Sequence, residues 1–402
     1  MPQNVTSSLA SGHRRAIGAA AIMIGVATLF LNVSPVVTGA IVSAFGFSNA
    51  QVGQLIGMPM FAAGLINLSQ IFWLRRVRNW QFALYFVMSG MVLGFVLAAF
   101  SASYTPLLFA FIFMGFAVGG VYGICMTLIG DSNDPDRGYG GAQLAQVVFS
   151  APLMFAIPAF LFPRFGFSGL MFVLAVLPFL CLFLVRLVPE KGLFNSTNPG
   201  LVEESQTHRT AGPASLKVEN STLALVFGIV AAVLLFQGYT GIWVFAERIG
   251  SEIGLQAITI GSILTFASVA GGFSTLIPIV CGDRFGRVKP TAIGVLAFVS
   301  GAMLLQVTGS LAYAAACSLL SIAYAICAPY MLAQLSASDE SGRYTASMPA
   351  IIVIASGIGP IISGWLYSDS YFPVLIYSGG SLVIALLAMM ASYRLMTKRG
   401  AG

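Results

Sequence analysis

The sequence predicts an all-α membrane protein with twelve transmembrane helices, arranged as two pseudo-symmetric six-helix bundles. Three observations support this fold class: an apolar composition, long segments without charge, and basic residues gathered on one side of the resulting layout. Of the 402 residues, 58% are hydrophobic and 8% are charged, whereas soluble domains carry about 25% charged residues. A water-soluble protein of this composition would expose large apolar patches, so lipid is the predicted solvent.

The first half of the chain holds six candidate spans. A helix needs about 20 apolar residues to cross a hydrocarbon core about 30 Å thick. Residues 16–74 contain no charged side chain and are long enough for two helices, with a turn signal at 46–49 between them. Residues 79–130 predict two more helices, and 138–163 and 165–185 predict one each.

A polar segment separates this half from a second set of six spans. Residues 189–219 show no hydrophobic periodicity, so we expect a cytoplasmic linker between an N-terminal bundle, 1–188, and a C-terminal bundle, 220–402. The charge-free segments of the second half cover 220–246, 253–282, 290–338, 344–368 and 370–393. The segment 290–338 is long enough for two helices, and each of the others predicts one.

Charge placement orients the twelve spans. All but two of the 19 Lys and Arg residues fall on one side of this layout, and the exceptions are Arg164 and Arg248. Cytoplasmic loops carry an excess of Lys and Arg. The sequence therefore predicts a multi-pass protein of the cytoplasmic (inner) membrane with both termini in the cytoplasm.

The two halves also match each other at a separation of 208 positions. The matched pairs are Gly46 with Gly254, Gly53 with Gly261, Tyr122 with Tyr330, Asp131 with Asp339, and Pro152 with Pro360. Parallel six-helix repeats are a known way to build a transporter, with the solute site between the halves near the membrane midplane. The repeat therefore favours a carrier.

The loop between the eighth and ninth predicted helices carries the most specific motif. Residues 282–287 read Gly-Asp-Arg-Phe-Gly-Arg, which is similar to the Asp-Arg-x-Gly-Arg core of the loop motif of the major facilitator superfamily. The six-plus-six layout extends this resemblance over essentially the whole chain, and it implies alternating access around a central cavity. It also implies gating roles at cytoplasmic helix ends, which we assign to Asp283, Arg284, Arg287, Asp131 and Asp339.

The corresponding loop of the first half departs from the family pattern. It reads Trp-Leu-Arg-Arg-Val-Arg over residues 73–78, with Leu74 where the family has Asp. We therefore expect that this half lacks the usual carboxylate latch. The fifth helix has Ser-Ala-Pro at 150–152, without the glycine-rich motif of drug/proton antiporters, and this weakens an antiporter assignment.

Glu247 and Arg248 are the charged residues nearest to mid-depth. Charge in the hydrocarbon core is costly and commonly functional, so Glu247 is the acidic candidate for proton coupling, and Arg248 is a candidate partner for a monoanion. Adjacent helix positions do not face each other, so both enter a cavity only if the helix is broken there. The alternative is an interfacial position for both side chains.

Uncharged polar and aromatic side chains near mid-depth are the remaining candidates for solute binding. Amides and phenols inside lipid need hydrogen-bond partners, so we expect them to face the interior of the bundle. The candidates are Asn32, Tyr122, Gln143, Gln146, Gln237, Tyr239, Trp243 and Tyr330. The alternative for each is a hydrogen bond that only joins neighbouring helices.

These candidates predict the class of solute. An uncharged cavity favours a small neutral or monoanionic organic solute, aromatic or carboxylate-bearing, over phosphorylated sugars, which would need several buried Arg or Lys residues. We predict a secondary active transporter that works by alternating access, with proton-coupled uptake favoured. Efflux of a drug-like or metabolite compound by proton antiport is the alternative.

The sequence lacks the residues that other classes of function would need. An enzyme acting on lipid would need His, Asp, Glu or Cys clustered at membrane depth, but His13 and His208 both fall on the predicted cytoplasmic side. A sensor or scaffold would carry a signalling domain or a structured tail, and the sequence predicts neither. We expect no cofactor, no metal and no nucleic-acid partner; the expected partners of the monomer are a small-molecule solute, membrane lipid and protons.

Overall fold

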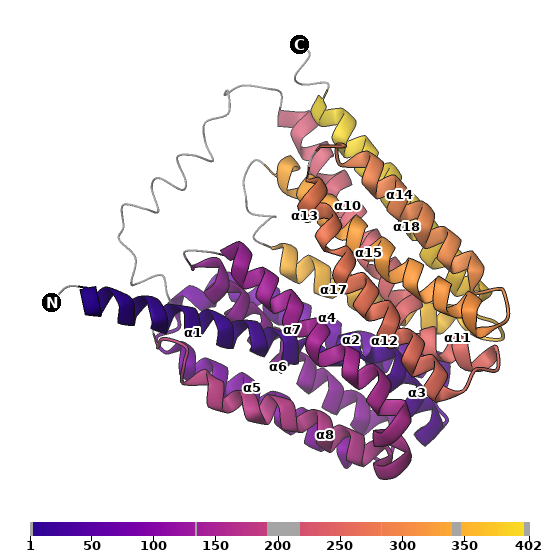
Figure 1. The fold of residues 1–402 in the computed structure, drawn as a ribbon, viewed down its shortest axis with the longest axis horizontal. Coiled ribbons are helices and arrows are strands. Elements are labelled where there is room, and N and C mark those ends of the chain that lie inside the picture. Colours follow the sequence, from indigo (N-terminus) through magenta and orange to yellow (C-terminus); the bar gives the residue numbers. More distant parts are fainter. Residues whose placement is uncertain (1–2, 133–134, 191–217, 283, 340–346, 398–402) are drawn as a thin grey trace.

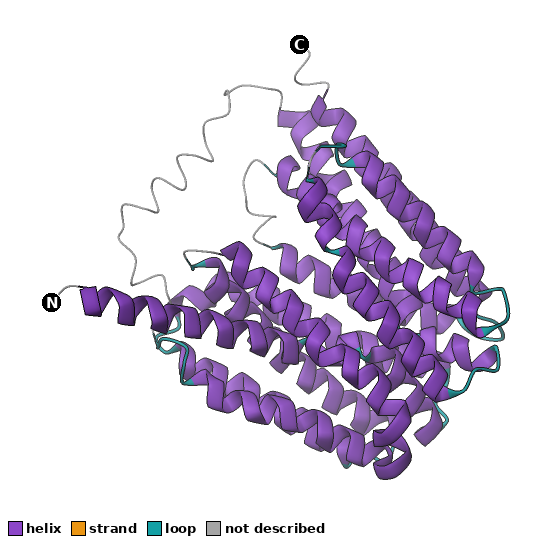
Figure 2. Cartoon of the chain, viewed as in Figure 1, coloured by secondary structure: helices purple, strands orange, loops and turns teal. Residues whose placement is uncertain are grey.

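The computed structural model describes residues 3–132, 135–190, 218–282, 284–339 and 347–397. Over these residues the chain consists of helices joined by short turns, without a β-strand (Figure 2). The prediction of an all-α protein is confirmed. Nearly all of the predicted linker, 189–219, lies outside the described residues.

The first helix of the N-terminal half is broken into three pieces. They are α1 (Gln3–Ala27), α2 (Leu29–Asn32) and α3 (Ser34–Phe45). The predicted turn follows, where Gly46 adopts a φ of 64°, a backbone region that favours glycine. Ser48 then begins α4 (Asn49–Trp73), because its hydroxyl accepts a hydrogen bond from the backbone N–H of Gln51 in a capping box.

The rest of this half is a run of long helices. Its elements are η1 (Leu74–Arg76), α5 (Trp80–Ala99), α6 (Tyr104–Gly130), α7 (Pro135–Ala156), the π-helical turn η2 (Ile157–Leu161) and α8 (Phe162–Val185). The sequence predicts the boundary between the fifth and sixth spans at Arg164, and the helix is interrupted two residues later, at Gly166, with φ 63° and ψ −167°. Glycine tolerates positive φ, so Gly166 allows the chain to turn at this position.

The C-terminal half repeats the pattern with more breaks. Its elements are α10 (Val218–Trp243), α11 (Ala246–Glu252), α12 (Ala257–Ser274), α13 (Leu276–Cys281), α14 (Val288–Leu304), α15 (Ser310–Ser338), α17 (Met348–Leu366) and α18 (Phe372–Thr397). The structure corrects one detail of the prediction, because the helix expected over 220–246 ends at Trp243. The backbone of Phe245, with φ −96° and ψ 6°, separates α10 from α11.

Nine helices of the described part are long and apolar enough to cross a membrane. One of them covers Arg137–Val185 and contains 49 residues, enough for two spans, and it is interrupted at Gly166. The broken first helix and α14, which rises about 26 Å at 1.5 Å per residue, are the other segments that the prediction of twelve spans requires.

The two halves form a V that is closed at one end (Figure 1). The indigo-to-magenta first half and the orange-to-yellow second half meet where α3 packs on α11, and they diverge toward α13 and the start of α1. Along the contact, α4 packs on α17 and α7 packs on α12. We call the end near α3 and α11 the closed end, and the opposite end the divergent end.

Glycines allow α4 and α17 to approach each other closely. A Cβ atom at Gly53 would overlap the carbonyl oxygen of Pro360, and one at Gly57 would overlap that of Gly357. Small residues at helix contacts are typical of membrane proteins, where backbones pack directly. Backbone packing therefore joins the two halves along this contact.

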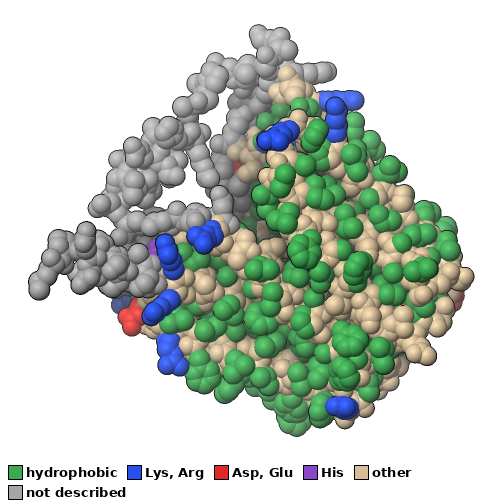
Figure 3. Space-filling view, viewed as in Figure 1, with side chains coloured by type: hydrophobic (Ala, Val, Ile, Leu, Met, Phe, Trp, Pro, Cys, Tyr) green, Lys and Arg blue, Asp and Glu red, His purple; other side chains and the backbone are tan. Residues whose placement is uncertain are grey.

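The surface has the chemistry of a lipid-facing protein. Hydrophobic side chains cover the visible flanks of both halves in Figure 3, and Lys and Arg side chains gather mainly along the upper left edge, near the divergent end. Large apolar side chains such as Phe72, Phe82 and Phe86 are exposed. Water would make such exposure costly, whereas acyl chains do not.

Candidate solute-binding cavity

A cavity of about 1310 Å³ lies between the two halves. Its wall is built by α1, α2, α4, α6 and α7 of the first half and by α10, α12, α13, α15 and α17 of the second. It extends from Trp243 to Ile279, near the end of α13 and the divergent end. None of the described residues that line it is Asp, Glu, Lys, Arg or His, so the cavity suits an uncharged solute.

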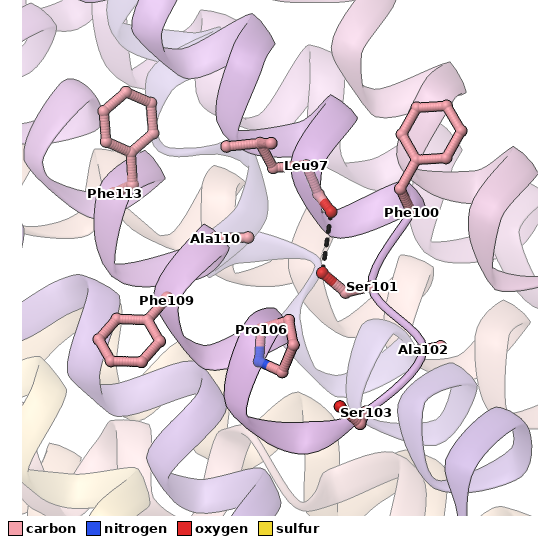
Figure 4. A pocket seen from close by; sticks show the side chains of 9 residues that line it. All are labelled: Leu97, Phe100, Ser101, Ala102, Ser103, Pro106, Phe109, Ala110 and Phe113. Carbon is pink, nitrogen blue, oxygen red and sulfur yellow. Dashed lines mark hydrogen bonds between the residues drawn. The ribbon is translucent and has the colours of Figure 1, made fainter.

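A second pocket, of about 720 Å³, lies on the outside of the first half, between the ends of α5 and α6 (Figure 4). Phe100, Phe109 and Phe113 are exposed around it. The hydroxyl of Ser101 donates to the carbonyl oxygen of Leu97, 2.8 Å away. This bond satisfies one of the few polar groups of the pocket. A pocket that faces outward and lacks convergent polar groups does not have the features of a solute site.

A row of amides forms the polar wall of the central cavity. Gln143 and Gln146 lie three residues apart on α7 and therefore share one helix face. The Nδ2 atom of Asn32, on α2, donates to Oε1 of Gln146 at 3.4 Å, and Nε2 of Gln146 donates to Oε1 of Gln143 at 3.2 Å. Asn32 also donates to the hydroxyl of Thr28 at 3.4 Å. We call these four residues the amide row.

A stack of aromatic rings forms the facing wall. Tyr239 and Trp243 lie four residues apart on α10, with ring centroids 5.7 Å apart and an interplanar angle of 17°. Tyr324, on α15, stacks on Tyr239 at 4.0 Å and 13°. Phe236 meets Tyr324 edge-on at 5.8 Å. We call Trp243, Tyr239 and Tyr324 the aromatic stack.

Tyr122 adds an aromatic side chain from the first half. It is half-buried on α6 and lines the cavity. The helix that carries it approaches α4 closely, because a Cβ atom at Gly119 would overlap the carbonyl oxygen of Ala63. Of the eight side chains proposed from the sequence for solute binding, six therefore line one cavity: Asn32, Tyr122, Gln143, Gln146, Tyr239 and Trp243.

The other two candidates, Gln237 and Tyr330, do not line the cavity. Gln237 lies where α10 packs against α17, since its carbonyl oxygen occupies the place of a Cβ atom at Gly359. Tyr330 is buried, and its hydroxyl donates to the carbonyl oxygen of Gly282 at 3.1 Å. The Tyr330 contact matches the alternative of a hydrogen bond that only joins neighbouring segments.

Glu247 and Arg248 lie in α11, outside the cavity lining. The helix is broken before them, yet both contact the first half at the closed end. The Nε atom of Arg248 donates to Oδ1 of Asn49 at 3.2 Å, and Nδ2 of Asn49 donates to the carbonyl oxygen of Tyr367 at 3.0 Å. The Glu247 carboxyl group fills the space beside Gly39 of α3.

The residues proposed for gating contact neighbouring helices in different ways. At the divergent end of the first half, Asp131 makes a two-pronged ion pair with Arg75, with distances of 2.8 and 2.9 Å. The carboxylate of Asp131, at the end of α6, thus pairs with the loop that has Leu74 in place of the family's Asp. This contact differs from the usual latch, and the expectation that this half lacks that latch stays a prediction. The pair joins two elements within one half.

In the second half, the corresponding loop lies only partly within the described residues. Asp283 lies outside them. Arg284 is exposed, whereas Arg287 donates from Nη1 to the carbonyl oxygen of Ala333 at 2.9 Å. Asp339 is buried at the end of α15.

Among the cavity residues that were not predicted from the sequence, Tyr324 and Asn67 carry an aromatic ring and an amide. Tyr324 lies midway along α15, between Ser310 and Ser338, so measuring depth from both helix ends would have placed it near the midplane. Asn67 lines the cavity from α4 with 7% of its surface exposed. An amide inside an apolar helix was the signal that could have found it.

Comparisons with known proteins agree with this geometry. The family model described as Major Facilitator Superfamily matches residues 225–401. No curated protein matches the chain in sequence. The segment that matches the family model, 225–401, includes the loop motif at 282–287.

Solved structures share the fold over nearly the whole chain. The xylose transporter XylE from E. coli, in a partially occluded inward-open conformation, has a TM-score of 0.72 and 14% identity, covering 94% of this chain and 97% of that one. A bacterial homologue of the human lysosomal transporter Spinster has a TM-score of 0.67 and 14% identity, covering 96% and 98%. The nucleoside transporter NupG has a TM-score of 0.66 and 14% identity, covering 94% and 99%.

At this level of identity the structural likeness establishes the fold. The family match covers the second half, and the shared fold extends over the first. The chain therefore resembles the major facilitator superfamily over residues 225–401, and it shares its overall fold with solved membrane transporters.

Proposed function

We propose that the protein takes up a small, uncharged organic solute across the cytoplasmic membrane by alternating access. The main support is the cavity between the two halves, whose described lining residues carry no charge, with an amide row on one wall and an aromatic stack on the other. Secondary transporters bind solute near the midplane between two repeats that rock against each other. The solved structures described as xylose and nucleoside transporters support this class of solute.

The proposed orientation places the divergent end in the cytoplasm. Arg75, Arg284 and Arg287 lie at this end in the loops after α4 and α13, and cytoplasmic loops are enriched in basic residues. The described conformation is then inward-open, with the outer gate closed. In this arrangement the chain works as a monomer of two bundles, 1–188 and 220–402, joined by the linker 189–219, with both termini in the cytoplasm.

We assign proton coupling to Glu247, at the outer closure between the halves. Its carboxyl group lies beside Gly39 and accepts no hydrogen bond from the residues that the structure describes, while its neighbour Arg248 donates to Asn49 instead. An ionised carboxylate that is half-buried without a donor is costly, so closure of this contact is easiest with the carboxyl group protonated. Opening of the outer gate then exposes the group to external protons.

The test is transport by the purified protein in proteoliposomes, with and without an inward proton gradient. The probes are radiolabelled D-xylose and uridine, followed by a panel of neutral metabolites. We expect accumulation of at least one neutral solute that the gradient stimulates. Absence of flux for every solute of the panel contradicts the proposal of a carrier. Solute flux that runs only outward, opposite to the inward proton gradient, supports antiport instead.

A further inference from the structure

We propose that the cavity selects an uncharged solute with a flat, unsaturated ring, which stacks on the aromatic stack while its polar edge hydrogen-bonds to the amide row. The proposal rests on the transport function proposed above and narrows its solute class. It depends on three features of the cavity: parallel rings on one wall, exchangeable amides on the other, and the lack of charge among the described lining residues.

The parallel arrangement of the rings is unusual within this protein. Among the described residues, most close aromatic pairs meet edge-on, as the pair of Phe30 and Phe111 does at 64°. Parallel stacking is found at two pairs within the aromatic stack and, elsewhere in the described part of the chain, only between Phe45 and Phe47, at the closed end. Parallel rings from two helices present planar surfaces to a planar ligand, so the cavity wall is already arranged for stacking.

The amide row supplies the polar side of this recognition. Its hydrogen bonds, at 3.2 to 3.4 Å, are longer than the usual 2.9–3.0 Å. A solute that replaces them therefore breaks only weak hydrogen bonds within the protein. Each carboxamide offers two N–H donors and one carbonyl acceptor. The row can therefore pair with neighbouring carbonyl and N–H groups on the edge of a heterocycle, or with hydroxyl groups.

The uncharged lining excludes the charged relatives of such a solute. A buried phosphate or carboxylate would lose its hydration without gaining an ion pair from the described lining. The rings, in contrast, discriminate by shape. Stacking of a flat base on an aromatic side chain changes affinity by about 5- to 150-fold in other proteins, whereas a saturated ring has no π face with which to stack.

The first experiment measures binding to the purified full-length protein by tryptophan fluorescence. Trp243 is the reporter, because it lines the cavity whereas Trp73, Trp80 and Trp365 do not. The flat probes are uridine, adenosine and nicotinamide; the saturated probes are D-ribose and D-xylose; the charged probe is uridine monophosphate. We expect at least one flat probe to bind at least about tenfold more tightly than both saturated probes, and more tightly than the charged probe, with a signal that Trp243→Phe removes.

The second experiment changes the stack itself. Tyr324→Leu removes a ring and should weaken binding of the flat probe by about fivefold or more, whereas Tyr324→Phe keeps the ring and should change it by less than about twofold. Tyr393→Leu, at an exposed position on α18, is the matched control and should leave affinity unchanged. Isothermal titration calorimetry provides the same comparison without relying on fluorescence.

Three results would overturn the proposal. They are the absence of binding by every flat probe, equal or tighter binding of a saturated probe, and unchanged affinity in Tyr324→Leu. If that variant does not fold, the comparison of flat with saturated probes on the unmodified protein still decides the question. Gradient-driven uptake of D-xylose without any binding of flat probes would overturn the ring proposal and leave the transport function standing.

Discussion

The contact between Gly57 on α4 and Gly357 on α17 gives the sharpest prediction about conformational balance. A Cβ atom at Gly57 would overlap the carbonyl oxygen of Gly357 and lie 2.6 Å from Cγ1 of Ile361. Carbon atoms without a bond between them prefer 3.5–4.0 Å. The first clash involves backbone, so a change of rotamer cannot relieve it, and Gly57→Ala should force the two helices apart.

The size of the effect follows from the cost of overpacking. Extra methyl groups in a tight contact cost about 1–3 kcal/mol. If this cost applies only when the helices are in contact, the equilibrium shifts toward the open outer gate by about 5- to 150-fold. The gain in helix propensity from Gly to Ala, up to about 1 kcal/mol, is common to both conformations and does not affect the balance.

Electron spin resonance between two labels measures this shift. The labels are placed at Ser43 and Ser368, exposed positions of the two halves at the closed end, in a cysteine-free background. Gly141→Ala is the control, because its Cβ would lie 3.7 Å from that of Ala21, an ordinary contact. Gly57→Ala should add a population at longer distance that the control lacks; identical distance distributions in the two variants would refute the reasoning.

Three further predictions concern single side chains. Glu247→Gln should retain solute binding but lose stimulation of uptake by a proton gradient, and undiminished stimulation would remove Glu247 as the coupling group. Arg75→Ala should lower the apparent Tm by removing the ion pair to the largely buried Asp131 carboxylate, at a cost of about 1 kcal/mol, while Arg78→Ala should not. Gln146→Leu should weaken solute binding by about tenfold through lost hydrogen bonds, measured by calorimetry, with an unchanged Tm; a fall in Tm without a change in affinity would make Gln146 a packing residue.

Helix positions were largely predictable because lipid imposes strict requirements on length and charge. The turns at Gly46 and near Gly166 were expected from charge and turn residues, and both are present. The break after Trp243 was not expected. Its sequence contains no proline, and tertiary packing at Phe245, which is completely buried, decides the backbone there.

Which face of each helix meets the cavity was harder to predict. Lipid tails are as apolar as a protein interior, so the hydrophobic pattern distinguishes the two faces poorly. Gln143 and Tyr239 were found because they are polar or aromatic at mid-depth, and the same rule selected Tyr330, whose hydroxyl instead reaches Gly282. The rotation of each helix about its axis decides whether such a side chain faces the cavity or a neighbouring helix. That rotation is set by packing.

Alternating access requires a single cavity that opens in turn to each side of the membrane. Its test is the reactivity of a cysteine placed at Gln143, in a cysteine-free background, toward a membrane-impermeant thiol reagent added from either side of oriented vesicles. We expect labelling from the cytoplasmic side in the otherwise unmodified protein, and added labelling from the outside when Gly57→Ala is present. Labelling from neither side, or labelling that Gly57→Ala does not change, would contradict it.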